Sequence, residues 1–278
     1  MIITILGSGA SEGIPAFLCT CSRCAHARKA RGPEIRQNAC TLVTSHTGTS
    51  LLIDMPPQFK MAWDTGGFDQ SALLGILITH RHEDHTLGLK YLVDAHPRNG
   101  VTDPHPIAAW MPQEVEEQWF GRTPPAAAIR VQRVAAARPF EIGPFTVTPV
   151  ETLHLRPDDP GDARGQSFGY LIDDSDGTRL AYMVDSPPRF SEETSRILGT
   201  RRLDCLVFEC TFAQGPPVSQ HTDLEGLQTI RRSLDPRIMI ASHVSHLNLG
   251  HRDLQELLGP QGITVAFDGM RVEFHGAV

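Results

Sequence analysis

Short runs of apolar and β-branched residues recur in both halves of the chain, and runs of this kind predict β-strands. They cover residues 2–6, 49–55, 73–79, 145–153, 169–174, 178–185, 204–210, 237–243 and 262–268. Helical stretches are predicted between them at 86–96, 112–121, 191–200 and 223–234, with Pro, Ser or Asp near their starts, as helix N-termini prefer. This interleaving predicts an α/β fold in which two mixed sheets pack face to face with helices outside.

The stretch from 96 to 144 is rich in Pro and Ala, a composition that is also typical of a linker. It contains Trp110, Trp119 and Phe120, and aromatic side chains of this size require a core in which to be buried. We therefore interpret it as an excursion within one domain. With 278 residues, 40% of them hydrophobic, the chain is long enough for a substantial core, and residues 1–278 are expected to form a single domain.

Charge and composition narrow the class of protein further. A formal net charge of -7 opposes docking onto a large nucleic acid, because many phosphate contacts need a basic surface. The first residues, MIITILGSGA, enter an apolar strand without a basic leader and are too short to span a membrane, so we expect a cytoplasmic protein with no membrane partner. In that compartment six cysteines favour metal ligands or buried thiols over disulfides.

The densest group of polar residues, THRHEDH at 79–85, directly follows the apolar run LLGILI. Solvated charge runs are built from Lys, Glu, Asp and Arg, whereas imidazole is typical of metal and proton chemistry. Along an extended strand end His80 and His82 point the same way, so both can reach one ion. Asp84 and His85 follow where the chain must turn. This segment is therefore predicted to bind metal.

Three further polar residues stand where predicted strands end, namely His154, Asp185 and His243. Strand ends are where α/β folds gather functional groups. A single histidine or aspartate at such a place is commonly an ordinary hydrogen-bonding or turn residue, so these three are predicted to be ligands only in combination with 80–85. Seven nitrogen and oxygen ligands are sufficient for two divalent ions that share a carboxylate and keep positions open for water.

HRHEDH fits the H-x-H-x-D-H signature of the metallo-β-lactamase superfamily, and the later His, Asp and His are similar in order to the remaining ligands of that superfamily. The resemblance implies an α/β fold of the αβ/βα type, a four-layer sandwich of two mixed sheets. It also implies one ion held by His80, His82 and His154, a second held by Asp84, His85 and His243, and Asp185 as the ligand that both share. The di-iron, oxygen-reducing branch typically carries Glu at the second position, whereas His82 favours hydrolysis with Zn²⁺ or Mn²⁺.

A second group of candidate ligands lies in a loop at about 17–26, where Cys19, Cys21 and Cys24 have C-x-C-x2-C spacing. Buried inert thiols usually occur singly, so this grouping indicates a shared ion. Three thiolates need a fourth ligand to close a tetrahedral structural zinc site. Spacing alone leaves His26, Cys40 and His246 as candidates. A free-standing zinc module for nucleic acid would need a second local ligand pair, which this loop lacks.

LGSGASEGIPAFLCTCSRCAHAR, THRHEDH, SFGYLI, QHTDL, SHVSH and FDGM together resemble the PhnP family of phosphoribosyl cyclic phosphodiesterases, over nearly the whole chain. That family serves phosphonate metabolism in the bacterial carbon-phosphorus lyase pathway. The resemblance implies that His246 is the fourth zinc ligand while His243 serves the catalytic ions, so that one strand end ties both sites together. It also implies catalytic roles for Asp84 and for His221, whose imidazole would bind phosphate or protonate the leaving oxygen.

The activity implied by the resemblance is dinuclear, metal-dependent hydrolysis of a small cyclic phosphodiester of the 5-phosphoribosyl 1,2-cyclic phosphate type. Two catalytic ions, Mn²⁺ or Zn²⁺, would lower the pKa of a shared water so that hydroxide is the nucleophile, and one structural Zn²⁺ would occupy the cysteine site. The expected partners are a small phosphodiester substrate and, by resemblance, a second copy in a homodimer. The segment 155–167 is longer than the family pattern, and Arg156 and Arg164 in it are candidate phosphate contacts.

Two alternative functions within the same fold remain open. One is a pyrroloquinoline quinone biosynthesis B protein, which shares the glycine-rich start and the cysteine cluster but usually lacks the full H-x-H-x-D-H set. The other is an RNA-processing nuclease of the superfamily, which the acidic balance and the lack of an obvious basic RNA-gripping segment disfavour.

Overall fold

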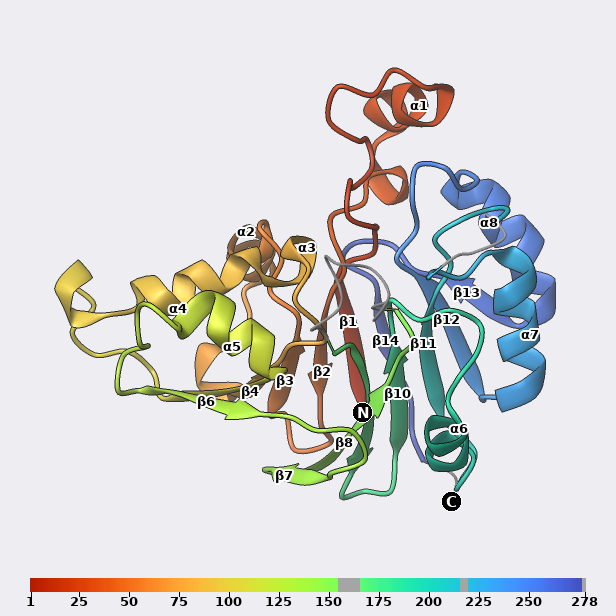
Figure 1. Ribbon diagram of the computed structural model, residues 1–278. Coiled ribbons are helices and arrows are strands. Elements are labelled where there is room, and N and C mark those ends of the chain that lie inside the picture. Colours follow the sequence, from red (N-terminus) through yellow and green to blue (C-terminus); the bar gives the residue numbers. More distant parts are fainter. Residues whose placement is uncertain (155–165, 216–219, 277–278) are drawn as a thin grey trace.

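The structure is a computed structural model that describes residues 1–154, 166–215 and 220–276. Within these residues fourteen strands form two seven-stranded sheets (Figure 1). In spatial order the first sheet contains β14 (Arg271–Glu273), β1 (Ile2–Gly7), β2 (Cys40–Thr44), β3 (Ser50–Ile53), β4 (Leu73–Leu77), β5 (Ile107–Met111) and β6 (Ile129–Arg133). The second contains β13 (Ile263–Val265), β12 (Ile238–Ser242), β11 (Cys205–Glu209), β10 (Arg179–Met183), β9 (Phe168–Asp174), β8 (Phe145–Glu151) and β7 (Phe140–Ile142).

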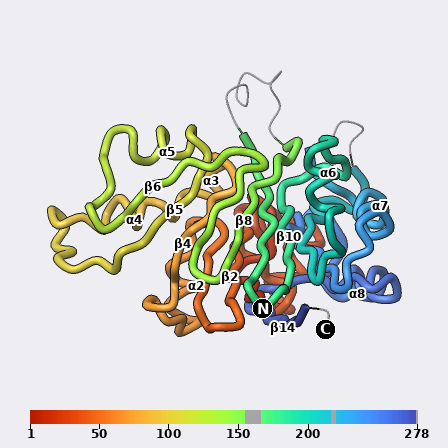
Figure 2. Tube along the Cα trace, turned by 90° about the horizontal axis from the view of Figure 1, so that it is seen from below, coloured from red at the N-terminus to blue at the C-terminus, as the bar shows by residue number. Residues whose placement is uncertain are grey.

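Helices cover the outer face of each sheet (Figures 1 and 2). On the first sheet lie α2 (Phe59–Gly66), α4 (Lys90–Asp94) and α5 (Gln113–Phe120), and on the second lie α6 (Glu192–Leu198), α7 (Leu224–Leu234) and α8 (His251–Leu258). A short α3 (Glu83–Thr86) follows β4, and α1 (Ser22–Ala30) stands clear of both sheets beyond the strand ends (Figure 1). The order helix, sheet, sheet, helix is the predicted four-layer sandwich.

The central strands bury both faces, which explains why they were visible as apolar runs. In β11, Cys205 and Val207 point into the core between the sheets, whereas Leu206 and Phe208 point into the core under the helices of the second sheet. Strand β3 alternates in the same way between the inner core and the core under α2. Alternation with both faces apolar gives nearly continuous hydrophobic sequence, and all nine predicted strands are confirmed.

Other elements were missed or placed imperfectly by the sequence. Strand β6 (IRVQR) lies at a sheet edge and is mostly exposed, and β14 is only three residues long, so neither gives an apolar run. The helix predicted at 86–96 is a 3₁₀ turn followed by the short α4. The stretch 96–144 contributes β5, α5, β6 and β7, and Trp110 stacks on Phe140 with ring centroids 5.3 Å apart. Its aromatic residues are therefore packed against the sheets, as the sequence indicated.

The ends of β4, β8, β10 and β12 meet at one edge of the sandwich, above the sheets in Figure 1. His80 follows β4 of the first sheet and His154 follows β8 of the second, and their ring centroids lie 4.9 Å apart. This edge therefore brings together residues from both halves of the chain. Across the described residues, every helix is too short or too polar to cross a bilayer.

Candidate metal centre and active site

Three histidines from the two sheets point their ring nitrogens at a common centre. His80 Nε2 lies 2.9 Å from His82 Nδ1, and His154 Nε2 lies 3.1 Å from the same atom. Nitrogens at about 2.0–2.1 Å from one ion are separated by roughly 2.9 Å at right angles and 3.4 Å in a tetrahedron. The three nitrogens therefore have the spacing of ligands to a single ion.

The second cluster contains Asp84, His85 and His243, with Asp185 between the two groups. His85 Nε2 lies 2.8 Å from Asp185 Oδ2 and 3.3 Å from Asp84 Oδ2. The other oxygen of Asp185 lies 3.3 Å from His243 Nε2 and 3.9 Å from His154 Nε2. All seven residues predicted to form the dinuclear site are thus brought together, and Asp185 has the position of a shared ligand.

Several buried polar atoms at this centre form no hydrogen bond with one another but are placed to bind divalent ions. Within the described residues His85 Nε2, His243 Nε2 and Asp185 Oδ2 are buried and make no hydrogen bond, although they lie within 2.8–3.3 Å of oppositely polarised atoms. An unsatisfied buried polar group costs about 1–3 kcal/mol, so three of them at one point need an explanation. Their lone pairs converge on a shared centre, which is the arrangement that metal ligands require.

The outer ring nitrogens of the same histidines are bound by neighbouring groups. Nδ1 of His80 lies 3.0 Å from Thr79 Oγ1, that of His85 2.7 Å from Asp54 Oδ2, that of His243 3.0 Å from Thr211 Oγ1, and that of His154 3.3 Å from the Gln220 carbonyl. A carboxylate or carbonyl on Nδ1 keeps the proton there and leaves Nε2 as an acceptor, and so does a threonine hydroxyl that donates its own proton to a carboxylate, as Thr79 does to Asp54 and Thr211 to Glu209. These contacts fix the tautomer that binds metal.

Burial and neighbouring charges together set the protonation of the ligand residues. Burial lowers the pKa of His154 to about 4 and that of His80 well below its ordinary value, so both rings are neutral near pH 7. Burial opposes ionisation of Asp185, but His243 and His85 beside it hold its pKa well below the ordinary value. Burial also opposes protonation of His85, but the carboxylates of Asp84, Asp185 and Asp54 raise its pKa well above the ordinary value, so a metal ion bound there would displace a proton from this ring.

Three non-glycine residues at the site have left-handed backbones. Asp54, Asp185 and His243 have φ of 64°, 55° and 54°. This region costs a residue with a Cβ about 1–3 kcal/mol, and such positions gather at functional sites. Here each of the three follows an apolar strand. The left-handed backbone turns the side chains of Asp185 and His243 towards the centre and that of Asp54 towards His85.

Two buried acids of the site were missed by the sequence interpretation. Asp54 follows β3 and accepts hydrogen bonds from Thr79 N at 2.8 Å and from Thr79 Oγ1 at 3.0 Å, as well as contacting His85. Glu209 ends β11, is fully buried, and accepts a hydrogen bond from Thr222 N at 3.0 Å. The one available signal was a lone acid at the end of an apolar run, which is too common to single out either residue.

Glu209 supports His221, the histidine predicted to act in catalysis. His221 Nδ1 lies 3.0 and 3.2 Å from the two carboxylate oxygens of Glu209 and 3.4 Å from Asp185 Oδ1. Its ring stacks on His243, with centroids 5.4 Å apart. Burial opposes protonation of His221, but the negative charge and hydrogen bond of Glu209 raise its pKa to about 9. The ring is therefore held in its protonated form beside the metal ligands.

A cavity of about 440 Å³ opens over this centre. His82, Asp84, His154, Asp185, His221 and His243 all face it. Glu12, Phe212 and Leu247 form part of its other walls. Arg156 and Arg164, the predicted phosphate contacts, lie outside the described residues. A small substrate entering the cavity meets the ligand clusters and His221 together.

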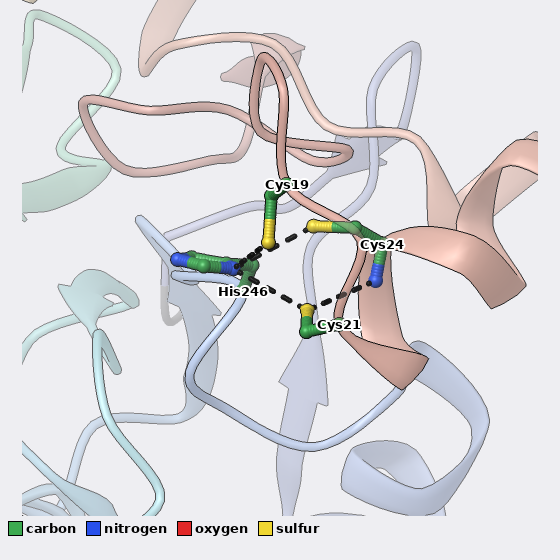
Figure 3. A group of neighbouring side chains, drawn as sticks. All are labelled: Cys19, Cys21, Cys24 and His246. Atoms are coloured by element: carbon green, nitrogen blue, oxygen red, sulfur yellow. Dashed lines mark hydrogen bonds between the residues drawn. The ribbon is translucent and has the colours of Figure 1, made fainter.

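Cys19 and Cys21 from the loop before α1 and Cys24 from the first turn of α1 converge on His246, so the predicted loop at 17–26 is helical from Ser22 (Figure 3). His246 Nδ1 lies 3.5, 3.6 and 3.5 Å from the Sγ atoms of Cys19, Cys21 and Cys24. With Zn–S near 2.3 Å and Zn–N near 2.0–2.1 Å, sulfur and nitrogen ligands of a tetrahedral ion are about 3.6 Å apart. The geometry therefore fits the predicted zinc site.

The other two candidates for the fourth ligand are engaged elsewhere. The side chain of His26 is 61% exposed and lies 3.9 Å from Glu34, and Cys40 is buried and donates to the Asp54 carbonyl. Within the cluster, hydrogen bonds from the Cys24 backbone and from His246 lower the pKa of Cys21 to about 6, whereas burial raises that of Cys24 to about 11. A metal ion bound in place of the thiol protons would stabilise the buried thiolate of Cys24, which burial alone disfavours.

Replacing Cys24 with serine tests the thiolate site. We expect the variant to lose the tightly held zinc and to melt about 5–10 °C lower, because a structural zinc contributes folding free energy directly. Its seven catalytic ligand residues are unaltered, so the catalytic ions should still bind at saturating concentrations. Zinc content and thermal melting are the measurements, with His26→Ala as the matched control, since this exposed neighbour lies outside the cluster. Equal loss of both classes of metal at an unchanged melting temperature would show that the cluster is misassigned.

The four-layer sandwich and the two buried ligand clusters at its edge define a metal-dependent hydrolase with the metallo-β-lactamase fold. The family described as "Beta-lactamase superfamily domain" matches residues 60–244. The chain belongs to this superfamily, as the H-x-H-x-D-H signature predicted. The fold and the ligands imply divalent ions such as Zn²⁺.

Similar proteins extend the comparison beyond the matched domain. The octanoyltransferase of Porphyromonas gingivalis is 25% identical over 275 residues, which cover 96% of this chain but 50% of that protein, so the chain spans half of its length. Coenzyme PQQ synthesis protein B of Klebsiella pneumoniae is 25% identical, with 98% of both chains covered. A crystal structure described as a new diphosphatase from the PhnP family matches with a TM-score of 0.79 at 25% identity, over 100% of this chain and 99% of that one.

Proposed function

We propose that this site hydrolyses a small cyclic phosphodiester of the 5-phosphoribosyl 1,2-cyclic phosphate type. The observation that carries the proposal is the Glu209–His221 pair at the cavity wall, 3.0 Å apart and beside the shared ligand Asp185. Phosphodiester cleavage needs a proton donor for the departing oxygen next to the ions, and His221 has that place. Similarity to a PhnP-family diphosphatase along the whole chain supports the same reaction class.

The proposed metal content is two catalytic ions, Mn²⁺ or Zn²⁺, and one structural Zn²⁺. The first catalytic position would use His80, His82 and His154, the second Asp84, His85 and His243, with Asp185 shared. When bound, divalent ions at such a centre polarise the phosphoryl oxygens and lower the pKa of a water molecule. Asp54 and Thr211 keep the rings of His85 and His243 aimed at the centre.

The remaining steps depend on the chain's own residues. Water adds to phosphorus, the bond from phosphorus to the sugar oxygen breaks, and the product is a monoester. His221 transfers a proton to the departing oxygen, while Glu209 on Nδ1 holds the ring in place and stabilises its charged form. Buried Glu209 is fixed in turn by Thr222 N, so the pair is rigid before substrate binds.

A second candidate is a role in coenzyme PQQ synthesis, which the match along 98% of both chains favours. The complete set of seven ligands together with His221 favours hydrolysis instead. A protein of the second kind would bind ions at the edge of the sandwich and leave phosphodiesters intact.

Parallel assays test the proposed reaction. The reconstituted protein should hydrolyse bis(p-nitrophenyl) phosphate and, faster, 5-phosphoribosyl 1,2-cyclic phosphate, with little action on a β-lactam. An octanoyl thioester is included because one relative is an octanoyltransferase, and a precursor tRNA is included for the nuclease alternative. Efficient turnover of the thioester or the RNA with both diesters untouched would refute the phosphodiesterase assignment.

A further inference from the structure

The two proposed metal sites are joined by one four-residue turn that follows β12. His243 opens the turn and faces the catalytic centre, and His246 closes it and faces the three thiolates. The turn cannot move as a free loop, because Val244 N donates to Ser8 O at 3.0 Å and Ser245 N donates to Thr211 O at 3.1 Å. Displacement at one end is therefore transmitted to the other.

Glu12 is the side chain that holds the middle of this turn. Its Oε1 accepts a hydrogen bond from Ser245 Oγ at 2.7 Å and another from His246 N at 3.0 Å. Ser245 Oγ accepts in turn from Leu247 N at 3.1 Å. Glu12 comes from the loop that leads from β1 to the cysteine cluster, and its side chain is 29% exposed at the wall of the catalytic cavity.

The side chain of Glu12 is thus held in place by hydrogen bonds to the turn. It lies between β1 and the cysteines along the chain, and it reaches across to Ser245 and to the backbone of His246, two and three residues beyond His243. At the other end of the turn the backbone of His243 has φ 54°, and its carbonyl accepts a hydrogen bond from Thr211 Oγ1 at 3.1 Å. A residue held in a strained conformation relaxes when its restraints are removed.

We propose that Glu12 is a positioning residue that couples the cysteine cluster to the catalytic centre through the turn 243–246. Filling the cluster with zinc fixes His246, and Glu12 then fixes the turn so that His243 stays aimed at its ion. Emptying the cluster or removing the carboxylate releases the turn and weakens binding of the catalytic ions. Coupling of this kind is reciprocal, so the catalytic ions strengthen zinc binding by the same factor. The proposal rests on the two proposed metal sites and is independent of the substrate.

Equilibrium dialysis with Mn²⁺ measures the coupling without any assay of activity. Cys21→Ser, at the exposed ligand of the cluster, and Glu12→Ala should each raise the Mn²⁺ dissociation constant of the catalytic centre about 10-fold, the lower end of the effect of residues that orient ligands. Glu12→Gln should stay within about 2-fold of the wild type, because its amide oxygen can still accept both hydrogen bonds. This rescue separates positioning from charge.

The double variant Cys21→Ser/Glu12→Ala distinguishes coupling from two independent effects. If both changes release the same turn, the double variant binds Mn²⁺ no more than about 2-fold more weakly than either single variant. Glu256→Ala, at an exposed glutamate of α8 that pairs with Arg252, is the matched control and should leave the dissociation constant unchanged. Melting of the metal-free proteins within about 2 °C of one another shows that the variants fold alike.

Other results of the Mn²⁺ binding experiments would contradict different parts of the proposal. Losses that multiply to roughly 100-fold in the double variant would mean independent sites and overturn the coupling. A Glu12→Gln variant as weak as Glu12→Ala would overturn positioning by hydrogen bonds. Wild-type protein that binds no Mn²⁺ would overturn the metal sites themselves, whereas tight wild-type binding that Glu12→Ala leaves unchanged would overturn this inference alone.

Discussion

Asp185→Ala is expected to lower hydrolysis by at least about 10³-fold and to reduce the bound catalytic metal, because one side chain serves both clusters. Its two oxygens lie 2.8 Å from His85 Nε2 and 3.3 Å from His243 Nε2, and Oδ1 is also 3.9 Å from His154 Nε2. Removing this carboxylate leaves the surrounding imidazoles without the negative charge that balances divalent ions. Metal analysis and diester turnover of the purified variant are the measurements.

Asp174→Asn is a matched control for this experiment. Asp174 is also a buried aspartate at a strand end, but it lies at the end of β9 and pairs with His46. Its replacement can lower stability without affecting the metal content. Zinc at the cysteine cluster should survive in Asp185→Ala, apart from the coupling proposed above. A variant of Asp185 that keeps both catalytic ions and more than about a tenth of the activity would contradict its role as the shared ligand.

His221→Ala should lower kcat by roughly 10²- to 10⁴-fold with the metal content unchanged, the usual range for losing a general acid. The loss should be smaller for p-nitrophenyl esters than for the cyclic sugar phosphate, since p-nitrophenolate departs with little need of a proton. Glu209→Gln should give a smaller loss in the same direction, because Glu209 acts through the ring of His221. Steady-state kinetics with both leaving groups measure these effects.

His46→Ala is the matched control for the His221 variant. His46 Nδ1 lies 2.8 Å from Asp174 Oδ1, so it forms a similar histidine–carboxylate pair away from the cavity. It should leave kcat unchanged with either substrate. If His221→Ala loses the same factor for both leaving groups, His221 binds phosphate and does not donate the proton. If it loses nothing, the catalytic assignment is wrong.

Most strands that are buried on both sides could be predicted from the sequence, but β2, which is buried between β1 and β3, was missed. Strands such as β11 are apolar at nearly every position, so the runs themselves show the two sheets. Edge strands and short helices gave no such signal, since β6 is largely exposed and β14 has three residues. The positions of these edge strands depend on pairing with strands that are distant along the chain, and the local sequence does not show this pairing.

The candidate metal ligands could also be predicted from the sequence, whereas the residues that hydrogen-bond to them could not. Histidines as dense as His80 and His82 could be recognised from their own segment, and they then gave weight to the single histidines His154 and His243 at later strand ends. Asp54 acquires its meaning only from contact with His85, 31 residues away. His246, the proposed fourth ligand of the cysteine cluster, lies 222 residues beyond Cys24, and spacing could not choose it. The family resemblance indicated His246, and the geometry agrees.

Protein stripped of its catalytic ions, with the zinc of the cysteine cluster retained, can be titrated with Mn²⁺ while hydrolysis of 5-phosphoribosyl 1,2-cyclic phosphate and the metal content are measured. This titration tests whether a dinuclear centre of this chain cleaves phosphodiesters. We expect no turnover without added metal, a rise that levels off near two bound Mn²⁺ per chain, and a further zinc that stays with the cysteines throughout. Diester cleavage that is independent of added metal, or fully loaded protein that leaves the diester intact, would contradict the claim.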